Sequence, residues 1–227
     1  MENDPCLDIS EKFFSIQGES TYAGRPCVFI RLTGCNLRCS YCDARYTYEE
    51  TGKKIAVSRL VDYASGYPGA IVEITGGEPL LQENVYPLMD RLLAAERTVL
   101  LETNGSMNLE RVPDDVIKIV DIKCPDSGMH EKMYPAELNH ISEKDEIKFV
   151  ISSRPDYEWA ATFIKTGLSA DPERYEEWTE NGRILFSPAG GILEPDRLAK
   201  WILADNLKVR LQIQLHKMLW PEETRGV

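Results

Sequence analysis

The chain has 227 residues, of which 43% are apolar, and it carries a formal net charge of −11 at pH 7. This length and apolar content suffice for one sizeable hydrophobic core, so a single α/β domain spanning residues 1–227 is expected. The acidic balance is opposite to the basic surface that follows a phosphate backbone, which argues against a nucleic-acid partner.

The N-terminal segment and the hydropathy of the chain indicate a cytoplasmic protein. Residues 1–5 read Met-Glu-Asn-Asp-Pro, where a signal peptide would need a basic start and an apolar run. Apolar stretches fall short of the length of a membrane-spanning helix, so no membrane partner is expected. In a reducing compartment the six cysteines are expected to be ligands or free thiols rather than disulfides.

Along the chain, β-rich runs alternate with amphipathic stretches, which is typical of βα units around a parallel sheet or barrel. The runs expected as strands are residues 27–32, 70–75, 98–103, 116–122, 146–151, 183–186 and 209–215. The stretches expected as helices are residues 57–64, 85–95 and 195–204. The acidic region near residues 163–182 is expected to be an irregular or helical insertion.

Polar residues follow several of these strands at the point where each strand ends. Thr75 leads into two glycines, Glu102 and Thr103 lead into Asn104, and Asp121 closes the run at 116–122. In barrels and open parallel sheets, ligands bind in the crevice at these strand ends. The sequence therefore predicts that these side chains and the loop after the first strand face one common site.

The most informative stretch, at residues 33–46, holds Cys35, Cys39 and Cys42 in a Cys-x-x-x-Cys-x-x-Cys spacing. Structural zinc normally takes four protein ligands, and electron-transfer iron–sulfur clusters usually take four cysteines. A compact set of three thiolates therefore predicts a metal cluster with one iron left free for another molecule. Gly34, a poor helix former, favours a loop here.

Two plainer interpretations of these thiols remain open. The cysteines would share one face of an α-helix, where free thiols often serve as small buried hydrophobes. They could instead recruit a histidine and bind zinc, although His130, His140 and His216 lie far away in sequence without paired ligand spacing. The remaining cysteines, expected to be structural, are Cys6, Cys27 and Cys124.

Residues 75–79, Thr-Gly-Gly-Glu-Pro, form a turn whose glycines let the backbone approach a ligand closely. Together with the cysteine triplet, this turn resembles the radical S-adenosylmethionine (SAM) superfamily. The resemblance implies a [4Fe-4S] cluster on Cys35, Cys39 and Cys42 and SAM bound to the open iron. The difficult chemistry would then belong to the cofactor, with no catalytic side chain assigned beyond cluster and SAM.

The segment before the cysteines narrows the resemblance to the 7-carboxy-7-deazaguanine synthase family of the queuosine pathway. The matching segments are residues 14–20, 24–26, 28–37, 41–43, 75–79, 102–105, 121–123, 148–150 and 212–217. The family implies an incomplete parallel β/α barrel of the radical SAM type. It also implies a lyase that converts 6-carboxy-5,6,7,8-tetrahydropterin to 7-carboxy-7-deazaguanine with loss of ammonia.

The resemblance also implies ligand-binding residues. Substrate contacts are expected from Ile16, Gln17, Gly18, Arg31, Thr75 and His216, with Glu19 and Glu102 as further polar candidates. The guanidinium of Arg31 suits the substrate carboxylate, which it can hold bidentately. SAM contacts are expected from Tyr41, Asp43, Gly77, Glu78, Asp121, Lys123 and Ser187. The family commonly has Ser-Pro-Lys where this chain has residues 121–123, so Lys123 is the part of that motif that is retained.

One departure concerns a metal ion. Family members usually place Thr or Ser after the Cys-Asp pair, where its hydroxyl helps to hold a Mg²⁺ ion, whereas this chain has Ala44. Alanine offers no oxygen to a hard cation, so a weaker Mg²⁺ dependence is expected. Asp43 or Thr47 would compensate, or the ion would be held by substrate and water alone. Two neighbouring arginines, Arg38 and Arg45, either lower the pKa values of the thiols or are solvated surface residues.

The expected partners are a small pterin substrate, an electron donor such as flavodoxin or ferredoxin, and a second copy of the chain in a homodimer. One alternative is a radical SAM activase that forms a glycyl radical on a protein partner. Another is an electron-transfer or zinc module without enzymatic activity. The basic Arg31 and the Ser-Ile-Gln-Gly-Glu run favour a small acidic substrate over a protein.

Overall fold

The computed structural model describes residues 4–133, 135–168, 172–221 and 225–227. Within these residues one sheet has the order β3-β1-β2-β4-β5-β6-β7-β8-β9. Strand β1 pairs antiparallel with β2 and β3, and every later pair from β2 to β9 is parallel. The strands are β1 (Cys6–Ile16), β2 (Pro26–Leu32), β3 (Lys53–Ala56), β4 (Ile71–Gly76), β5 (Val99–Thr103), β6 (Ile117–Ile122), β7 (Glu146–Ile151), β8 (Ile184–Pro188) and β9 (Arg210–Leu211).

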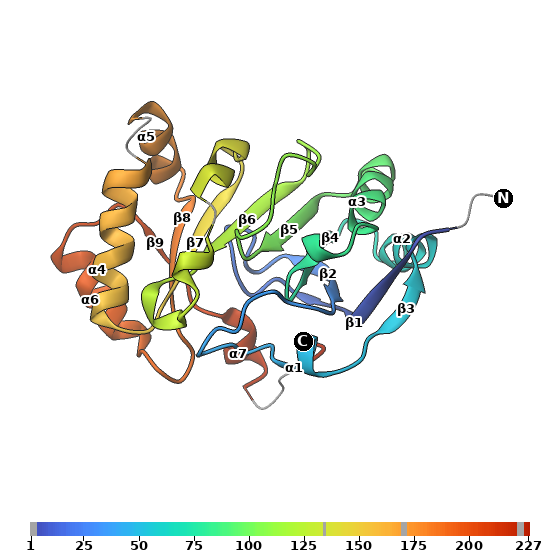
Figure 1. The fold of residues 1–227 in the computed structure, drawn as a ribbon, viewed down its shortest axis with the longest axis horizontal. Helices are drawn as coiled ribbons and strands as arrows, with labels where there is room; N and C mark the ends of the chain where they lie inside the picture. Colours follow the sequence, from blue (N-terminus) through green and yellow to red (C-terminus); the bar gives the residue numbers. More distant parts are fainter. Residues whose placement is uncertain (1–3, 134, 169–171, 222–224) are drawn as a thin grey trace.

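The edges of this sheet, β3 and β9, do not pair with each other, so the sheet stays open. This confirms the expected incomplete parallel barrel. Figure 1 shows the helices on the outside, with α2 and α3 over one end and α4, α5 and α6 over the other. The helices are α1 (Tyr46–Glu49), α2 (Val57–Ser65), α3 (Val85–Ala94), α4 (Arg154–Phe163), α5 (Pro172–Glu180), α6 (Pro195–Ala204) and α7 (Leu215–Leu219), and the short turns are η1 (Pro79–Leu81), η2 (Pro125–Ser127), η3 (His130–Lys132), η4 (Pro135–His140) and η5 (Ile164–Leu168).

Side chains alternate across each strand, and this alternation separates the core from the site. On β4, Val72 and Ile74 join the main core beneath the helices, while Ile71 belongs to a smaller apolar cluster on the inner face. Glu73 and Thr75 share that inner face with Ile71. The inner face therefore changes from apolar at the start of the strand to polar at its C-terminal end.

Most of the elements expected from the sequence are present. The exception is the run at 209–215, where only Arg210–Leu211 pair with β8 and the chain then turns into α7. In this segment the backbone N–H of Leu215 donates to Gly18 instead of extending a strand. Region 163–182 contains the π-helical turn η5 and helix α5, and its residues 169–171 lie outside the described part of the chain.

Strands β1 and β3 and helices α1, α4 and α7 were not expected. The sequence of β1, CLDISEKFFSI, mixes charged and apolar residues because much of the strand is only half buried. Its partner on one side is the short β3, whose lysines are exposed. A strand near a sheet edge carries a weak apolar signal, since it buries little surface.

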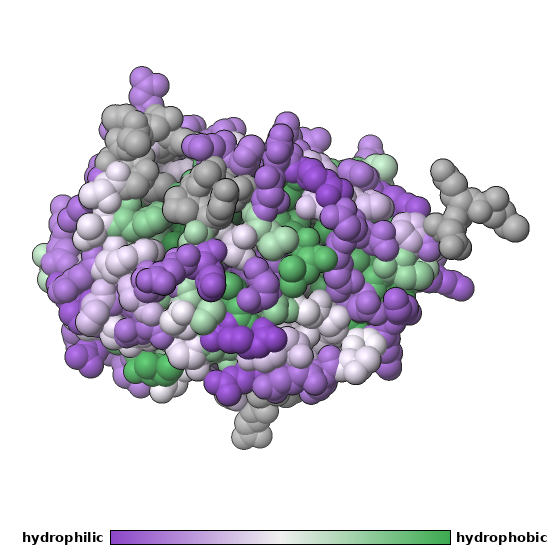
Figure 2. Space-filling model, in the orientation of Figure 1, coloured by the Kyte–Doolittle hydropathy of each residue, from purple (hydrophilic) through white to green (hydrophobic). Residues whose placement is uncertain are grey.

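The surface in the orientation of Figure 1 is mainly hydrophilic, with small hydrophobic patches between the polar residues (Figure 2). No helix among the described residues is both long and apolar enough to cross a membrane.

Candidate functional site

The C-terminal ends of the parallel strands surround a cavity of about 440 Å³. The cysteine loop lies at this end, beside α7 and the C-terminus (Figure 1). Of the residues expected from the sequence, those that line the cavity are Gln17, Glu19, Arg31, Cys35, Cys39, Tyr41, Cys42, Asp43, Thr75, Gly77, Glu102, Asp121, Lys123, Ser187 and His216. The expected residues that do not line it are Ile16, Gly18 and Glu78.

The Gly-Gly turn after β4 packs against the cysteine loop. Between β2 and α1 the chain has no regular secondary structure, so the three thiols lie on a loop and not on one face of a helix. A Cβ atom on Gly77 would lie 2.3 Å from the carbonyl oxygen of Gly34 and 2.5 Å from Cβ of Cys35. The backbone N–H of Glu78 also donates to Gly34 O, at 2.8 Å. Glycine at position 77 therefore permits the close contact that places Cys35.

Glu78 acts inside the protein and not at the cavity surface. Its side chain is fully buried and accepts hydrogen bonds from the backbone N–H groups of Leu80 and Asn104 and from the hydroxyl of Thr103. Burial raises the pKa of Glu78 to about 7, and the hydrogen bonds to its oxygens limit that rise. Asn104 in turn donates to Oδ1 of Asn36 at 3.0 Å. Glu78 thus connects strand β5 to the cysteine loop.

The six cysteines all lie within the described residues and are free thiols. Burial raises the pKa values of Cys39 and Cys42, and Lys123 partly opposes the rise at both. Arg38 and Arg45 are not among the main causes of these two pKa shifts. Both bond to loop backbone, Arg38 Nη1 to the carbonyl of Cys35 and Arg45 Nη2 to that of Ser40.

The donor set suits a cluster in which each thiolate binds a different iron. Among the described residues, no three His, Cys, Asp or Glu side chains converge as ligands of a single ion. Cys35, Cys39 and Cys42 instead all line the cavity. They are the residues that would hold a [4Fe-4S] cluster.

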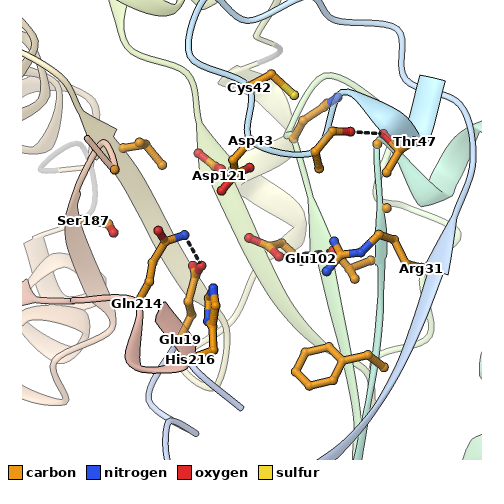
Figure 3. A pocket seen from close by; sticks show the side chains of 18 of the residues that line it. Glu19, Arg31, Cys42, Asp43, Thr47, Glu102, Asp121, Ser187, Gln214 and His216 are labelled. Carbon is orange, nitrogen blue, oxygen red and sulfur yellow. Dashed lines mark hydrogen bonds between the residues drawn. The ribbon is translucent and has the colours of Figure 1, made fainter. Parts of the chain in front are cut away.

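Beside the thiols, a polar wall from β6 and β8 offers contacts for a polar cofactor such as SAM. Asp121 pairs with Lys123 at 2.8 Å through Oδ2, while its buried Oδ1 has no hydrogen-bond partner in the described part of the chain. A buried acceptor without a partner is costly, so a ligand donor placed there would be favoured. Ser187 lies across the cavity from Asp121 in Figure 3, and Tyr41 donates its hydroxyl hydrogen to Val150 O.

The segment 17–20, between β1 and β2, is attached to the C-terminal segment. A Cβ on Gly18 would lie 2.1 Å from Nδ1 of His216, so only glycine fits against this imidazole. Gly18 O accepts from Leu215 N at 2.9 Å, and Ser20 N donates to Oε1 of Gln212 at 2.6 Å. Gly18 therefore acts through its backbone, and it places His216 at the cavity.

Glu19 is the centre of this attachment. Its oxygens accept from Lys148 and Gln212, both at 3.0 Å, and from Gln214 at 2.8 Å (Figure 3). Burial raises the pKa of Glu19, but the charge of Lys148 and the bond from Gln214 outweigh it and lower the pKa to about 2. The carboxylate is ionised and already well supplied with donors.

Arg31 and Thr75 are adjacent across the β2–β4 pair. Nε of Arg31 pairs with Oε1 of Glu11 at 2.7 Å, which leaves the terminal nitrogens of the guanidinium for a ligand. Thr75 donates to Glu102 at 3.2 Å. Figure 3 shows Arg31 and Glu102 side by side on the cavity wall.

The expected Mg²⁺ position lacks suitable oxygen donors. Ala44 has none, and the buried Thr47 hydroxyl donates to the carbonyl of Ala44 at 2.7 Å (Figure 3). The carboxylate of Asp43 is two-thirds exposed and lies 3.5 Å from Nζ of Lys217. The residues present therefore do not form a ready side-chain cage for a hard cation.

Sequence reasoning missed part of the cavity lining. Lys148 and Glu73 line it from β7 and β4, and so do Arg225, Gly226 and Val227 from the C-terminus. A lysine or glutamate inside an otherwise apolar strand was the available signal for the first two. The terminal residues carry no local signal, because their position depends on contacts such as the Arg225–Glu50 ion pair at 2.7 Å.

A family model and curated relatives agree on the kind of protein to which this chain is similar. The Radical SAM superfamily model matches residues 29–124. The 7-carboxy-7-deazaguanine synthase of Koribacter versatilis is 44% identical over 97% of this chain and 100% of the relative. The protein of the same name from Chlorobaculum tepidum is 41% identical over 100% of both chains.

Solved structures agree with these relatives. The crystal structure of QueE from Escherichia coli has a TM-score of 0.72 at 26% identity and covers 93% of this chain and 95% of its own. Streptococcus suis SuiB has a TM-score of 0.52 at 14% identity, over 83% of this chain and 48% of that protein, which shows likeness of fold alone.

Proposed function

This chain belongs to the 7-carboxy-7-deazaguanine synthase family of the radical SAM superfamily, and we propose on that basis that it makes 7-carboxy-7-deazaguanine. The substrate is 6-carboxy-5,6,7,8-tetrahydropterin, the ring contracts, and ammonia is lost. The reaction is that of a carbon–nitrogen lyase in queuosine and 7-deazapurine biosynthesis.

The observation that supports this function most directly is the set of residues that line one cavity. Three thiols line it together with Arg31, Thr75 and His216. A carboxylated heterocycle needs a cation, polar ring contacts and a position close to the cofactor, and these groups supply each of them. A glycyl-radical activase would instead need an open face for docking a protein.

The residues of this chain bind and orient, while the bound cluster and SAM supply the radical that takes a hydrogen atom from the substrate. Cys35, Cys39 and Cys42 would hold the cluster, and Gly77 lets the turn after β4 come close to the cysteine loop. Asp121 and Lys123 offer one acceptor and one donor to SAM. The free nitrogens of Arg31 bind the substrate carboxylate, since a guanidinium forms strong, directed bonds to carboxylates.

The loop after β1 and the segment before α7 enclose the substrate. Glu19 from the loop after β1 accepts hydrogen bonds from Gln212 and Gln214, which precede α7, so segments far apart in the chain contribute to one wall. This wall keeps water and competing reactants away from a radical intermediate. The C-terminal residues 225–227 extend the same wall.

An anaerobic assay tests the proposal. The protein is reconstituted with iron and sulfide and supplied with dithionite, SAM and 6-carboxytetrahydropterin, and the products are followed by mass spectrometry. We expect 7-carboxy-7-deazaguanine in excess over the SAM consumed, because SAM is regenerated in each turnover. Formation of deoxyadenosine without deazaguanine would show that the proposed substrate is wrong. The absence of both products from cluster-loaded protein would show that the proposed enzyme class is wrong.

Further properties belong to the proposal. We infer a cytoplasmic homodimer of single-domain chains that takes its electron from a flavodoxin or ferredoxin. Mg²⁺ contributes little, because Ala44 has replaced a hydroxyl ligand and the hydroxyl of Thr47 is bonded to the carbonyl of Ala44.

A further inference from the structure

A buried carboxyl group lies on the floor of the cavity. Glu73 on β4 stands two residues before Thr75, so both side chains point to the inner face of the sheet. It lines the cavity, although only 5% of its surface is exposed. Its register partners are Phe29 on β2 and Leu100 on β5, whereas Thr75 pairs with Arg31. Glu73 is therefore one layer further from the cysteine loop than Arg31.

One oxygen of Glu73 is engaged and the other is free. Oε2 accepts a hydrogen bond from the side-chain amide of Gln17, which is itself 2% exposed. In the described part of the chain Oε1 has no hydrogen-bond partner, and it is not sealed from the cavity. The Gln17 amide also accepts from the backbone N–H of Glu19 at 3.1 Å. The Gln17 side chain is thereby held in one orientation, with its amide group donating to Glu73.

The surroundings of Glu73 disfavour a negative charge. The charge of Arg31 lowers the pKa of Glu73 only in part, and Nε of Arg31 pairs with Glu11 at 2.7 Å. Lys148, which also lines the cavity, pairs with Glu19 at 3.0 Å. Burial, followed by the charge of Glu102, raises the pKa of Glu73 to about 8. The titratable groups that face Glu73 are Glu102 on β5, Glu19 on the loop after β1, and Arg31 and Cys27 on β2.

We propose that Glu73 is a substrate-binding residue that donates a hydrogen bond from Oε1 to the heterocyclic ring of the substrate. The proposal rests on the function proposed above. Because the Gln17 amide donates to Oε2, the proton of a neutral carboxyl group belongs on Oε1, toward the cavity. The Oε1 hydroxyl of a neutral carboxyl group is a donor, and this matches the ring carbonyl of a 2-amino-4-oxopyrimidine. An ionised carboxylate has only acceptors and would suit a different edge of that ring.

The layers of the cavity orient the substrate in the same way. In 6-carboxytetrahydropterin the carboxyl group and the pyrimidinone edge lie at opposite ends of the molecule. A carboxyl group bound by Arg31 leaves the pyrimidinone edge directed at the floor, where Glu73 lies. Beside Glu73, Phe13 and Phe29 stack with ring centroids 4.8 Å apart and supply an apolar wall for a flat ring.

Binding measured against pH tests this role. The probe is the reaction product, 7-carboxy-7-deazaguanine, which carries the same edge and is titrated calorimetrically into anaerobic holoenzyme with SAM and no reductant. For wild type we expect constant affinity up to about pH 7.5 and a loss of about tenfold per pH unit above pH 8. Glu73→Gln keeps a hydrogen-bond donor that does not titrate, so its affinity at pH 7 should lie within about threefold of wild type. Its affinity should not show the wild-type decrease above pH 8. Glu73→Leu should bind about tenfold more weakly at each pH.

A matched control separates binding from folding. Glu146 is also a fully buried carboxyl group that accepts from the 17–21 loop, through Thr21 N at 3.1 Å, but it lies outside the cavity. Glu146→Gln should lower Tm and leave the pH profile of binding unchanged. The role of Glu73 would be overturned if affinity fell with pH in the same way in wild type and Glu73→Gln, or if Glu73→Leu bound with wild-type affinity. The proposed function would stand in either case. A wild-type holoenzyme that does not bind the deazaguanine at any pH would overturn the proposed function and, with it, this inference.

Discussion

Replacing Lys148 with methionine tests how the loop after β1 is held against strands β5, β6 and β7 at the site. Nζ of Lys148 lies 3.0 Å from Glu19 and 3.7 Å from Asp121, and it also bonds Glu102. The lysine side chain is only 6% exposed. Methionine keeps the length and the apolar stem but removes the charge, so the three carboxylates lose their shared cation.

The expected cost follows from the burial of these charges. Removing one partner of a buried ion pair costs about 3–5 kcal/mol, because the remaining charge is left without compensation. Glu19 and Glu102 are 22% and 26% exposed, so solvent screens part of this cost and we expect about 3 kcal/mol at pH 7.

The cost should also depend on pH. Despite its burial, Glu19 has a pKa of about 2, below its usual value of 4.5, and Lys148 is the main cause of this lowering. Its pairing stabilises the folded state fully above pH 4.5, and this stability is lost as the pH falls toward 2. In Lys148→Met the carboxylates can take up protons as the pH falls, so the difference from wild type should shrink between pH 7 and pH 5.

Urea unfolding of the anaerobic holoenzyme, followed by tryptophan fluorescence at both pH values, measures this difference. The control is Lys200→Met, because Lys200 pairs with Asp196 at 2.6 Å on the surface and is 74% exposed. We expect that control to change the free energy of unfolding by less than about 0.5 kcal/mol. A loss below about 1 kcal/mol in Lys148→Met at pH 7 would refute the reasoning, because the carboxylates would then need no buried cation.

Other substitutions test single contacts. In Gly77→Ala the new Cβ would lie 2.5 Å from Cβ of Cys35, so iron bound per chain after reconstitution should fall by about half or more, and full iron content would contradict this contact. In Gly18→Ala the Cβ would lie 2.1 Å from Nδ1 of His216, so deazaguanine affinity should fall about tenfold at unchanged iron content; unchanged affinity would show that this imidazole is not needed for binding. Chelating Mg²⁺ should lower wild-type turnover less than about twofold, whereas Ala44→Thr should create a measurable dependence; abolished wild-type turnover would contradict this view of the site.

Motifs within short segments accounted for much of the site. The spacing of Cys35, Cys39 and Cys42 predicts the cluster loop, and polar residues after apolar strands predict that Thr75 and Asp121 face a common cavity. These predictions succeed because parallel strands bring their C-terminal ends to one edge of the sheet, whatever the loops between them do. The family resemblance added Arg31, whose place on a cavity wall a lone arginine in a strand does not reveal.

The sequence by itself determined the cysteine loop, the glycine turn after β4 and the β/α order of a parallel sheet, because each depends on neighbours within a few residues or on a regular period. Only the tertiary structure decided how the open sheet is enclosed. Glu19 meets Lys148 and Gln214 across more than a hundred residues of chain. The pKa of Glu73 is raised only once the apolar strands and Glu102 surround it. Charge and burial at such positions depend on contacts between distant segments, and no local pattern encodes them.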